Sequence, residues 1–203
     1  MAKKLVPGND AIYIDDDGTI RCSSKHLSMR PTILTSKVVK VGQDYLLVPT
    51  QVDYGATSGY SLPLYSAGND EELYLNEYIA GRWDGASDIV VSVIGYLAIA
   101  ATANDDFKLQ MSWSNKATAS GVVLGTVTDV EVDTNIPDAR KAQYSIFKVD
   151  FTIDWDVNDP DIIASDAFYG RLRRIATAGT EFAGEFVVTH ITIQYQVNKM
   201  FKI

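Results

Sequence analysis

The sequence predicts an all-β protein, an antiparallel β-sandwich with an extended N-terminal arm. Several long segments after residue 85 alternate apolar and polar side chains with a period of two, as strands with one buried and one solvated face do. Gly, Asp and Asn residues separate these segments and are typical of tight turns. No heptad tract or internal repeat points to a helical shaft or a repeat architecture. Two sheets packed through their inner faces are the expected closure of such strands.

Length and composition restrict the class of protein. The 203 residues suffice for a core that needs no disulfide or metal. The formal net charge of −8 argues against a general nucleic-acid binder, which needs a basic surface. A single cysteine leaves no intrachain disulfide framework. No apolar stretch of a signal peptide follows the first residues, and the longest apolar run, Ile89–Ala103, is too short to span a bilayer. We therefore expect a soluble protein without a membrane partner.

Residues 1–84 are expected to form the arm, with short hairpins and a linker. Within it, residues 14–20 predict two strands joined by an Asp-Gly turn, because the central positions of such turns favour residues that tolerate positive φ. The helical spacing of Leu75, Tyr78 and Ile79 indicates a short helical turn near the end of the arm. Further short strands are expected at residues 11–14, 37–41 and 45–48.

Residues 85–203 are expected to form the sandwich domain. The segment Ile89–Ala100 is apolar on both faces. It therefore predicts a central strand covered by the opposing sheet on one side and by a subunit or the arm on the other. The β-branched segment Val122–Val132 predicts two short strands with a kink near Gly125. Strict alternation predicts further strands at residues 107–113, 147–155 and 187–197.

One segment fits two structures. Phe168, Leu172 and Ile175 have helical spacing, but the same stretch also alternates with arginines as a strand does. Gly170 would cost a helix interior about 1 kcal/mol relative to alanine, and the neighbouring segments are all β. We therefore predict a strand here.

Aromatic side chains are expected to supply most of the volume of the core, since each buries roughly 150–250 Å². They alternate with polar residues on the predicted strands, so they share the inner faces of the sheets. They are Phe107, Trp113, Phe147, Phe151, Trp155 and Tyr195.

No group of residues indicates a metal centre or a cofactor site. Asp15-Asp16-Asp17-Gly18 begins like a calcium loop, but an EF-hand needs a Glu at its twelfth position, where this chain has His26. The acidic segments at residues 104–106 and 158–161 are typical of turns. A cation held between two such loops is the alternative interpretation.

Catalytic motifs are likewise missing from the sequence. The two histidines are His26 and His190, and no Gly-x-Ser-x-Gly elbow accompanies them. No pair of carboxylates is singled out by an apolar setting, as the acid of a glycosidase would be. No glycine-rich phosphate loop with its lysine is present. Cys22 is interpreted as a thiol without a role. We expect a protein that is not an enzyme and has no catalytic residues.

The number of tyrosines, 11, is the most informative feature of the composition. Several tyrosines lie among Gly and Ser, a composition that makes adaptable contact surfaces at low entropic cost. Such rings either pack between subunits and onto a partner, which we prefer, or stack on sugar rings, which makes a carbohydrate-binding module the competing class. The candidate interface tyrosines are Tyr54, Tyr60, Tyr65, Tyr74 and Tyr78.

Charged residues supply a second candidate interface. Arg171, Arg173 and Arg174 are clustered on one predicted strand, and three aspartates within residues 150–156 project from one face of another. Opposite charges of this kind can pair across strands or across subunits. The alternative is a solvated polar face, since exposed ion pairs contribute only ~0–1 kcal/mol. The cluster is too small for nucleic-acid binding on an acidic chain.

The C-terminal half carries a resemblance to a known family. Ser-Asp-Ala-Phe-Tyr-Gly-Arg-Leu-Arg-Arg stands at residues 165–174, and a final strand runs from Gly-Glu to Tyr at residues 184–195. Together with residues 87–113 and 148–156, these segments resemble the jelly-roll domains of tailed-phage virion proteins, which occur in capsid decoration proteins, head fibres and tail appendages. The resemblance covers about residues 85–197, and residues 1–84 match no family.

The resemblance implies a jelly-roll sandwich and a virion component without enzymatic activity. Its expected state is a homotrimer, made in the host cytoplasm and carried on the virion, with the major capsid protein or other virion proteins as partners. The short chain favours a capsid decoration (cement) or head-fibre protein that docks on the particle through its N-terminal region. The alternative is a carbohydrate-binding, receptor-binding module of a tail appendage, with a glycan receptor as its partner.

Overall fold

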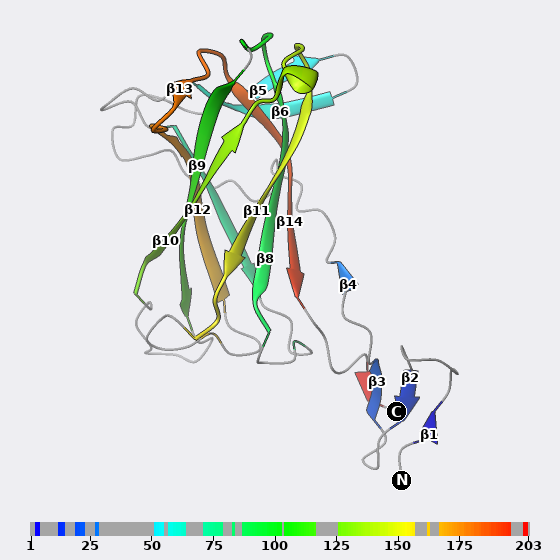
Figure 1. Cartoon of the computed structure of the whole chain (residues 1–203). Helices are drawn as coiled ribbons and strands as arrows, with labels where there is room; N and C mark the ends of the chain where they lie inside the picture. The colour runs from blue at the N-terminus through cyan, green and yellow to red at the C-terminus, as the bar shows by residue number, and fades with distance from the viewer. Residues whose placement is uncertain are drawn as a thin grey trace.

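The computed structural model of the chain is built of β-strands and confirms the prediction of an all-β sandwich. Two large sheets face each other across the core (Figure 1). The described residues form no α-helix, hold one 3-10 turn at Asp138–Arg140, and include no helix long and apolar enough to cross a membrane. The structure describes residues 3–4, 12–14, 19–22, 27–28, 51–54, 57–63, 71–78, 83, 87–102, 104–116, 126–156, 162, 167–195 and 201–202.

We name the two sheets after their central strands. The β8 sheet has the order β11 (Ile146–Ile153), β8 (Ile89–Leu97), β14 (Phe186–Tyr195), β6 (Thr57–Leu62) and β5 (Gln51–Tyr54), with β4 (Leu27–Ser28) also paired to β14. The β9 sheet has the order β10 (Thr128–Asn135), β9 (Asp105–Lys116), β12 (Ala167–Ile175) and β7 (Glu72–Tyr78), with β13 (Thr180–Glu181) parallel to β9. The chain crosses repeatedly between the sheets, which is a jelly-roll-like arrangement.

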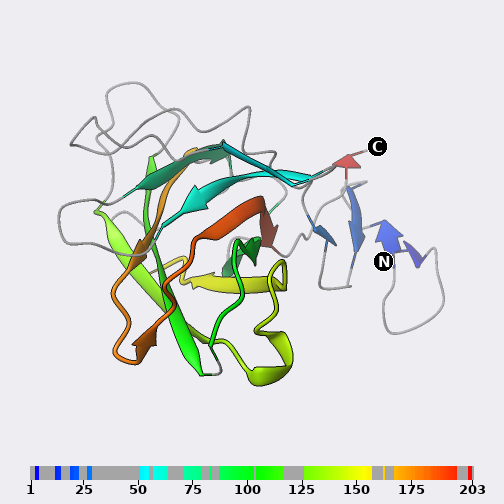
Figure 2. The same cartoon turned by 90° about the horizontal axis from the view of Figure 1, so that it is seen from above.

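The inner faces of both sheets supply one apolar core. Phe107 of β9 stacks on Phe186 of β14 with ring centroids 4.7 Å apart, and it meets Phe147 of β11 edge-on at 5.7 Å. The aromatic residues predicted for the core are all buried except Trp155, which is half-buried and lies edge-on to the buried Trp83. Viewed from above, the strands of the two sheets close around this core (Figure 2).

Several predicted strands are confirmed. The ambiguous segment forms the strand β12, not a helix. β8 is the predicted central strand, flanked by β11 and β14, and Ser92 and Tyr96 on the face away from the core are buried as well. Cover of this face by a subunit stays a prediction. β10 is a single strand, and the kink predicted near Gly125 lies outside the described residues, as do the strands predicted at residues 37–41 and 45–48.

The helical turn predicted near the end of the arm is wrong. β7 is an extended strand, paired with β12 from Ala167↔Tyr78 to Arg173↔Glu72. Leu73 and Leu75 are buried, whereas Tyr74 between them is only half-buried, which is a period of two. Only two core leucines mark this alternation, so the helical spacing of Leu75 and Tyr78 misled the sequence interpretation.

Residues 51–78, which the sequence analysis placed in the arm, contribute three strands to the sandwich sheets. β6 pairs with β14 and β7 pairs with β12, while β5 forms a hairpin with β6. β6 approaches β14 so closely that a Cβ atom on Gly59 would lie 2.6 Å from the carbonyl oxygen of Val188. The strand therefore needs glycine at this position, which weakens its local strand signal.

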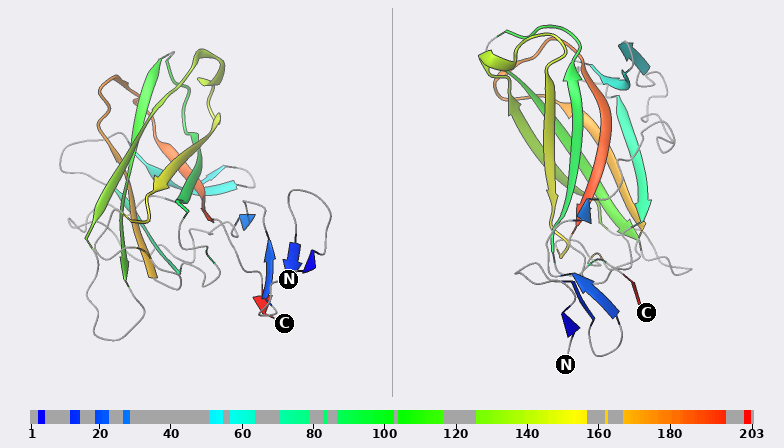
Figure 3. Two further views of the ribbon diagram at one scale, coloured as in Figure 1. Left: turned by 60° about the horizontal axis from the view of Figure 1, so that its bottom comes forward. Right: turned by 90° about the vertical axis from the view of Figure 1, so that its right-hand side faces the viewer.

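The two ends of the chain meet in a small separate sheet. Its order is β1 (Lys3–Lys4), β2 (Ile12–Ile14), β3 (Thr19–Cys22) and β15 (Phe201–Lys202). Ile14 is opposite Ile20, as the predicted hairpin with its Asp-Gly turn requires. This terminal sheet lies outside the two sandwich sheets (Figure 3).

Candidate binding face on the β9 sheet

The outer face of the β9 sheet brings together residues that are far apart in the sequence. On β12, Arg171 is opposite Tyr74 of β7 on one side and opposite Ser112 of β9 on the other. Tyr169 lies two residues earlier on the same face of β12 and is opposite Ser114. Because side chains alternate between the faces of a strand, all five point away from the core. They form two adjacent rows across the sheet.

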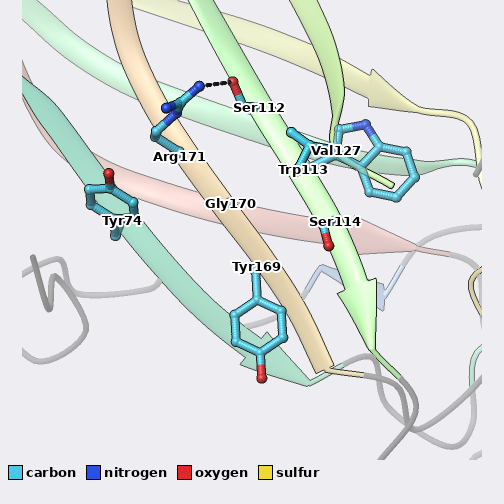
Figure 4. A pocket seen from close by; sticks show the side chains of 8 residues that line it. All are labelled: Tyr74, Ser112, Trp113, Ser114, Val127, Tyr169, Gly170 and Arg171. Carbon is cyan, nitrogen blue, oxygen red and sulfur yellow. Dashed lines mark hydrogen bonds between the residues drawn. The ribbon is translucent and has the colours of Figure 1, made fainter. Parts of the chain in front are cut away.

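These rows enclose a hollow of about 380 Å³ (Figure 4). Ser112 and Ser114 have short side chains, and they are flanked by the large side chains of Tyr169 and Arg171 on β12 and by Val127, which is 63% exposed. Small residues between large ones leave a depression. The volume is within the range of sites for small ligands, roughly 300–1,000 Å³. The residues lining it are Tyr74, Ser112, Trp113, Ser114, Val127, Tyr169, Gly170 and Arg171.

Hydrogen bonds fix the polar groups at the edge of the hollow. The Nη2 atom of Arg171 donates to the Oγ atom of Ser112 at 3.0 Å, and its Nη1 atom lies 3.4 Å from Oε1 of Glu72. The other oxygen of Glu72 accepts a hydrogen bond from the Tyr74 hydroxyl at 2.5 Å. Burial and the bond to Glu72 raise the pKa of Tyr74 above its usual value, so the phenol keeps its proton. The arginine and the tyrosine are therefore held in place before any ligand arrives.

A second set of bonds crosses the sheet in the next row. The Nε atom of Arg173 donates to Oε1 of Gln110 at 2.6 Å, and Nε2 of Gln110 donates to Oε1 of Glu131 at 2.9 Å. This connects β12, β9 and β10. We call these three side chains the cross-strand bridge. It borders the hollow on the side of Ser112.

The structure separates the residues that the sequence analysis had grouped. Tyr74 lines the hollow together with Arg171, and Arg173 lies in the cross-strand bridge. Tyr60 lies on β6 and is half-buried against the core. Tyr54 and Tyr78 belong to β5 and β7, and Tyr65 lies outside the described residues.

Arg174 was predicted as an interface residue, but the structure buries its side chain inside the fold. It faces inward with 2% of the side chain exposed, and it donates to Oε1 of Glu181 at 2.6 Å and to the carbonyl oxygens of Phe182 and Gly184. Alternation along β12 places Arg173 and Arg174 on opposite faces. The arginines therefore do not form one surface cluster.

The contacts of Asp150, one of the three predicted aspartates, lie within the β8 sheet. Asp150 lies on β11, where its carboxylate accepts from Nζ of Lys148 at 2.7 Å and from the Ser92 hydroxyl at 2.5 Å. Burial acts to raise the pKa of Asp150, but the bonds from Lys148 and Ser92 outweigh it, and the pKa is lowered. The ion pair of Asp150 is with Lys148 on the same strand, and its contact across strands, to Ser92 of β8, involves no second charge.

The acidic turn at residues 104–106 shows the local chemistry that the sequence suggested. Asn104 has a φ of 67°, and Oδ2 of Asp105 accepts a hydrogen bond from the backbone N–H of Thr102 at 2.8 Å. His190 is exposed, with Nδ1 3.0 Å from the Thr189 hydroxyl. In the described part of the chain, no three His, Cys, Asp or Glu side chains come together as metal ligands. Residues 15–18 lie outside that part.

Tyr169, Ser112 and Ser114 are functional candidates that the sequence analysis missed. Each lies at an alternating polar position of a strand and has no motif of its own. Only the register of β12 against β9 brings them together. The available signal was the pair of small residues on β9 between two longer ones, Gln110 and Lys116.

The carboxyl group of Glu71, just before β7, makes the stability of the fold depend on pH. Burial, and then repulsion from Glu185, raise the pKa of Glu71 to about 7 from its ordinary 4.5. A raised pKa in the folded state stabilises the protein at low pH, and this contribution is lost as the pH rises from about 4.5 through about 7.

We therefore expect the melting temperature to fall between pH 5 and pH 8, and the substitution Glu71→Gln to remove part of that fall. The effect should be well below the ~3 kcal/mol of a fully buried group with such a shift, because solvent screens a partly exposed carboxylate. Thermal melts of both proteins at pH 5 and pH 8 measure it. Parallel pH profiles would contradict the assignment.

The comparisons with known proteins identify no family. No protein-family model matches the chain, and no curated protein matches its sequence. Among solved structures, the chain is similar to a carbohydrate-binding module, CBM28, specific for non-crystalline cellulose. The sequence identity is 10%, the TM-score is 0.47, and the match covers 81% of this chain and 93% of that one.

Proposed function

We propose that this chain is a carbohydrate-binding domain without catalytic activity, and that it binds sugar in the hollow on the β9 sheet. One observation carries this proposal: half-buried tyrosine rings border the hollow beside hydroxyl and guanidinium groups that are already hydrogen-bonded to one another. A sugar ring has apolar C–H faces and a polar rim of hydroxyl groups. It therefore suits a site that joins an aromatic surface to fixed donors and acceptors.

The side chains at the site would lose little conformational freedom when a ligand binds. Arg171 is held by Ser112 and Glu72, and Tyr74 is held by Glu72. Ordering such side chains on binding would otherwise cost about 0.5–1.5 kcal/mol each. Their fixed positions leave more of the interaction energy for affinity.

The carboxylates near the hollow support binding over hydrolysis. A glycosidase needs two carboxyl groups on either side of the scissile bond, with access to the sugar. No described residue that lines the hollow has a carboxyl group. The nearest one named above, Glu72, has a side chain only 7% exposed and is occupied by Arg171 and Tyr74. We therefore expect no cofactor and no turnover of the bound glycan.

The proposal is tested by titrating the full chain with a panel of neutral and acidic oligosaccharides and polysaccharides. We expect saturable binding to at least one class, measured by calorimetry, with no release of reducing sugar on long incubation. Ser114→Phe fills the hollow and should abolish binding. Thr152→Phe, on the exposed face of β11 in the other sheet, is the matched control and should bind normally. A folded protein that binds no member of the panel would overturn the proposal.

A second candidate function is that of a virion structural protein, a trimeric capsid decoration or head-fibre protein. Two observations support it beside the sequence resemblance. The terminal sheet formed by β1, β2, β3 and β15 is separate from the sandwich and is available as a docking element. On the outer face of the β8 sheet, Ile146 lies opposite Tyr96 and diagonal to the half-buried Ile94, and its 68% exposure suits contact with another subunit. A receptor-binding module of a tail appendage would combine both candidates.

The virion role predicts that breaking the terminal sheet prevents attachment to particles. Ile20→Pro removes a backbone N–H from β3 in the full chain and should disrupt its pairing with β2 and β15. We expect this variant to keep the mass of a trimer by light scattering and to keep its glycan binding, but to be absent from purified particles. Incorporation at the level of the unchanged chain, or a monomeric mass for that chain, would contradict the virion proposal.

A further inference from the structure

A row of hydrogen-bonded side chains borders the hollow at one end. The cross-strand bridge of Arg173, Gln110 and Glu131 stands directly beyond Ser112, one row further along the sheet. Its two hydrogen bonds, of 2.6 Å and 2.9 Å, run across the strands at right angles to the direction in which the serines follow each other. In this row the long side chain of Gln110 takes the β9 position that the short Ser112 and Ser114 hold in the rows of the hollow.

The rows beyond the bridge are also occupied by paired side chains. Nζ of Lys108 lies 3.4 Å from Glu131 and 3.9 Å from Asp133. The Thr177 hydroxyl lies 2.9 Å from both carboxylate oxygens of Asp133. A ligand that continued past Ser112 in this direction would have to break these interactions. The other end, at Tyr169 and Val127, carries no such bridge among the described residues.

The charges around the hollow balance to a small negative value. Arg171 faces Glu72, and Arg173 is linked through Gln110 to Glu131. Asp129 of β10, opposite Ser112, adds a further negative charge. With Lys108 and Asp133 of the following row included, three positive charges stand against four negative ones among the described residues, which gives no attraction for a carboxylate or a sulfate. An anion on Arg171 would also lie close to the Glu72 carboxylate, which is 3.4 Å from Nη1 and repels a second negative charge.

We propose that the hollow takes the terminal sugar of a neutral glycan, with its ring over Ser112 and Ser114 and the rest of the chain leaving past Tyr169 and Val127. This inference rests on the proposed function and specifies its ligand. The cross-strand bridge blocks the path that an internal segment of a long chain needs. The balanced charges disfavour acidic sugars.

The test uses linear neutral gluco-, manno- and galacto-oligosaccharides of increasing length, with oligogalacturonides as the acidic probe. Calorimetry measures how many proteins bind each glycan chain. Recognition of chain ends gives one protein per recognised end at every length, with a constant affinity per end. Binding to acidic chains should be at least about tenfold weaker, as expected from losing ~1.4 kcal/mol or more.

Gln110→Ala removes the centre of the bridge. The number of proteins bound per glycan should then increase with the length of the glycan chain. Thr152→Ala, exposed on the other sheet, is the control. A number of bound proteins that grows with chain length in the unchanged protein would overturn end recognition, and equal binding of acidic chains would overturn neutral selectivity. Both of those results would leave the proposed function intact. Failure to bind any neutral or acidic glycan would overturn the proposed function and this inference together. If Gln110→Ala still binds once per end, the bridge is not the barrier.

Discussion

Replacing Tyr169 by alanine is expected to weaken glycan binding about 5- to 30-fold, the effect of losing about 1–2 kcal/mol at an important contact. Tyr169 points outward from β12, the strand between β7 and β9, and its half-buried ring borders the hollow beside Ser114. Removing the ring takes away the apolar surface on which a sugar can stack. It also widens the hollow, so the serines lose a neighbour that shapes their side of the site.

The matched control for this prediction is Tyr169→Phe. It keeps the ring and removes only the hydroxyl, so it should bind within about threefold of the unchanged protein if stacking provides most of the energy. Calorimetric titration gives both affinities. Thermal melts should show little change for either variant, because the side chain lies on the outer face. Unchanged affinity of Tyr169→Ala would show that the hollow is not the glycan site.

The sequence was sufficient to predict the strands whose inner face is fully apolar. β9 alternates from Phe107 to Ser114 and β11 from Phe147 to Ile153, and their residues Phe107, Met111 and Phe151 are buried as expected. β12 was also predicted, because Gly170 weakens the helical alternative. In each of these segments the local pattern and the tertiary burial agree, which is why pattern alone was enough.

Strands with little apolar patterning could not be predicted in the same way. β6 contains Gly59 where its backbone approaches β14, and β7 has only Leu73 and Leu75 facing the core. Both are recruited by pairing with strands about 90 or more residues later in the chain. Such pairing depends on tertiary context, which overrides weak local preferences.

The candidate site shows the same limit more strongly. Tyr74 and Arg171 were predicted as contact residues, but their neighbours Ser112, Ser114 and Tyr169 were not. A site on a sheet face is defined by strand order and register, and neither can be read from one sequence without knowing which strands pair. Register also explains why Arg173 and Arg174, adjacent in sequence, have unrelated roles.

Replacing Arg174 by alanine is expected to destabilise the fold by about 3–5 kcal/mol, the usual cost of removing one partner of a buried ion pair. Its guanidinium links β12 to Glu181 of β13 and to the carbonyls of Phe182 and Gly184 before β14, and it lies 5.5 Å from the Phe182 ring centroid. Burial lowers the pKa of Arg174, while Glu181 acts to raise it. Without the arginine, Glu181 and the two carbonyl oxygens lose a charged donor that is itself 2% exposed.

Arg173→Ala is the matched control, because it changes the same residue type one position away on the outer face. Exposed ion pairs and surface substitutions usually contribute less than ~1 kcal/mol, so its melting temperature should change by only a few degrees. For a chain of this length, Arg174→Ala should lower the melting temperature by roughly 6–20 °C. Arg174→Lys should lie between the two, since one ammonium group cannot reach all three acceptors with the geometry of a guanidinium. Equal melting temperatures of the two alanine variants would show that Arg174 does not hold β13 and its loop against the sandwich.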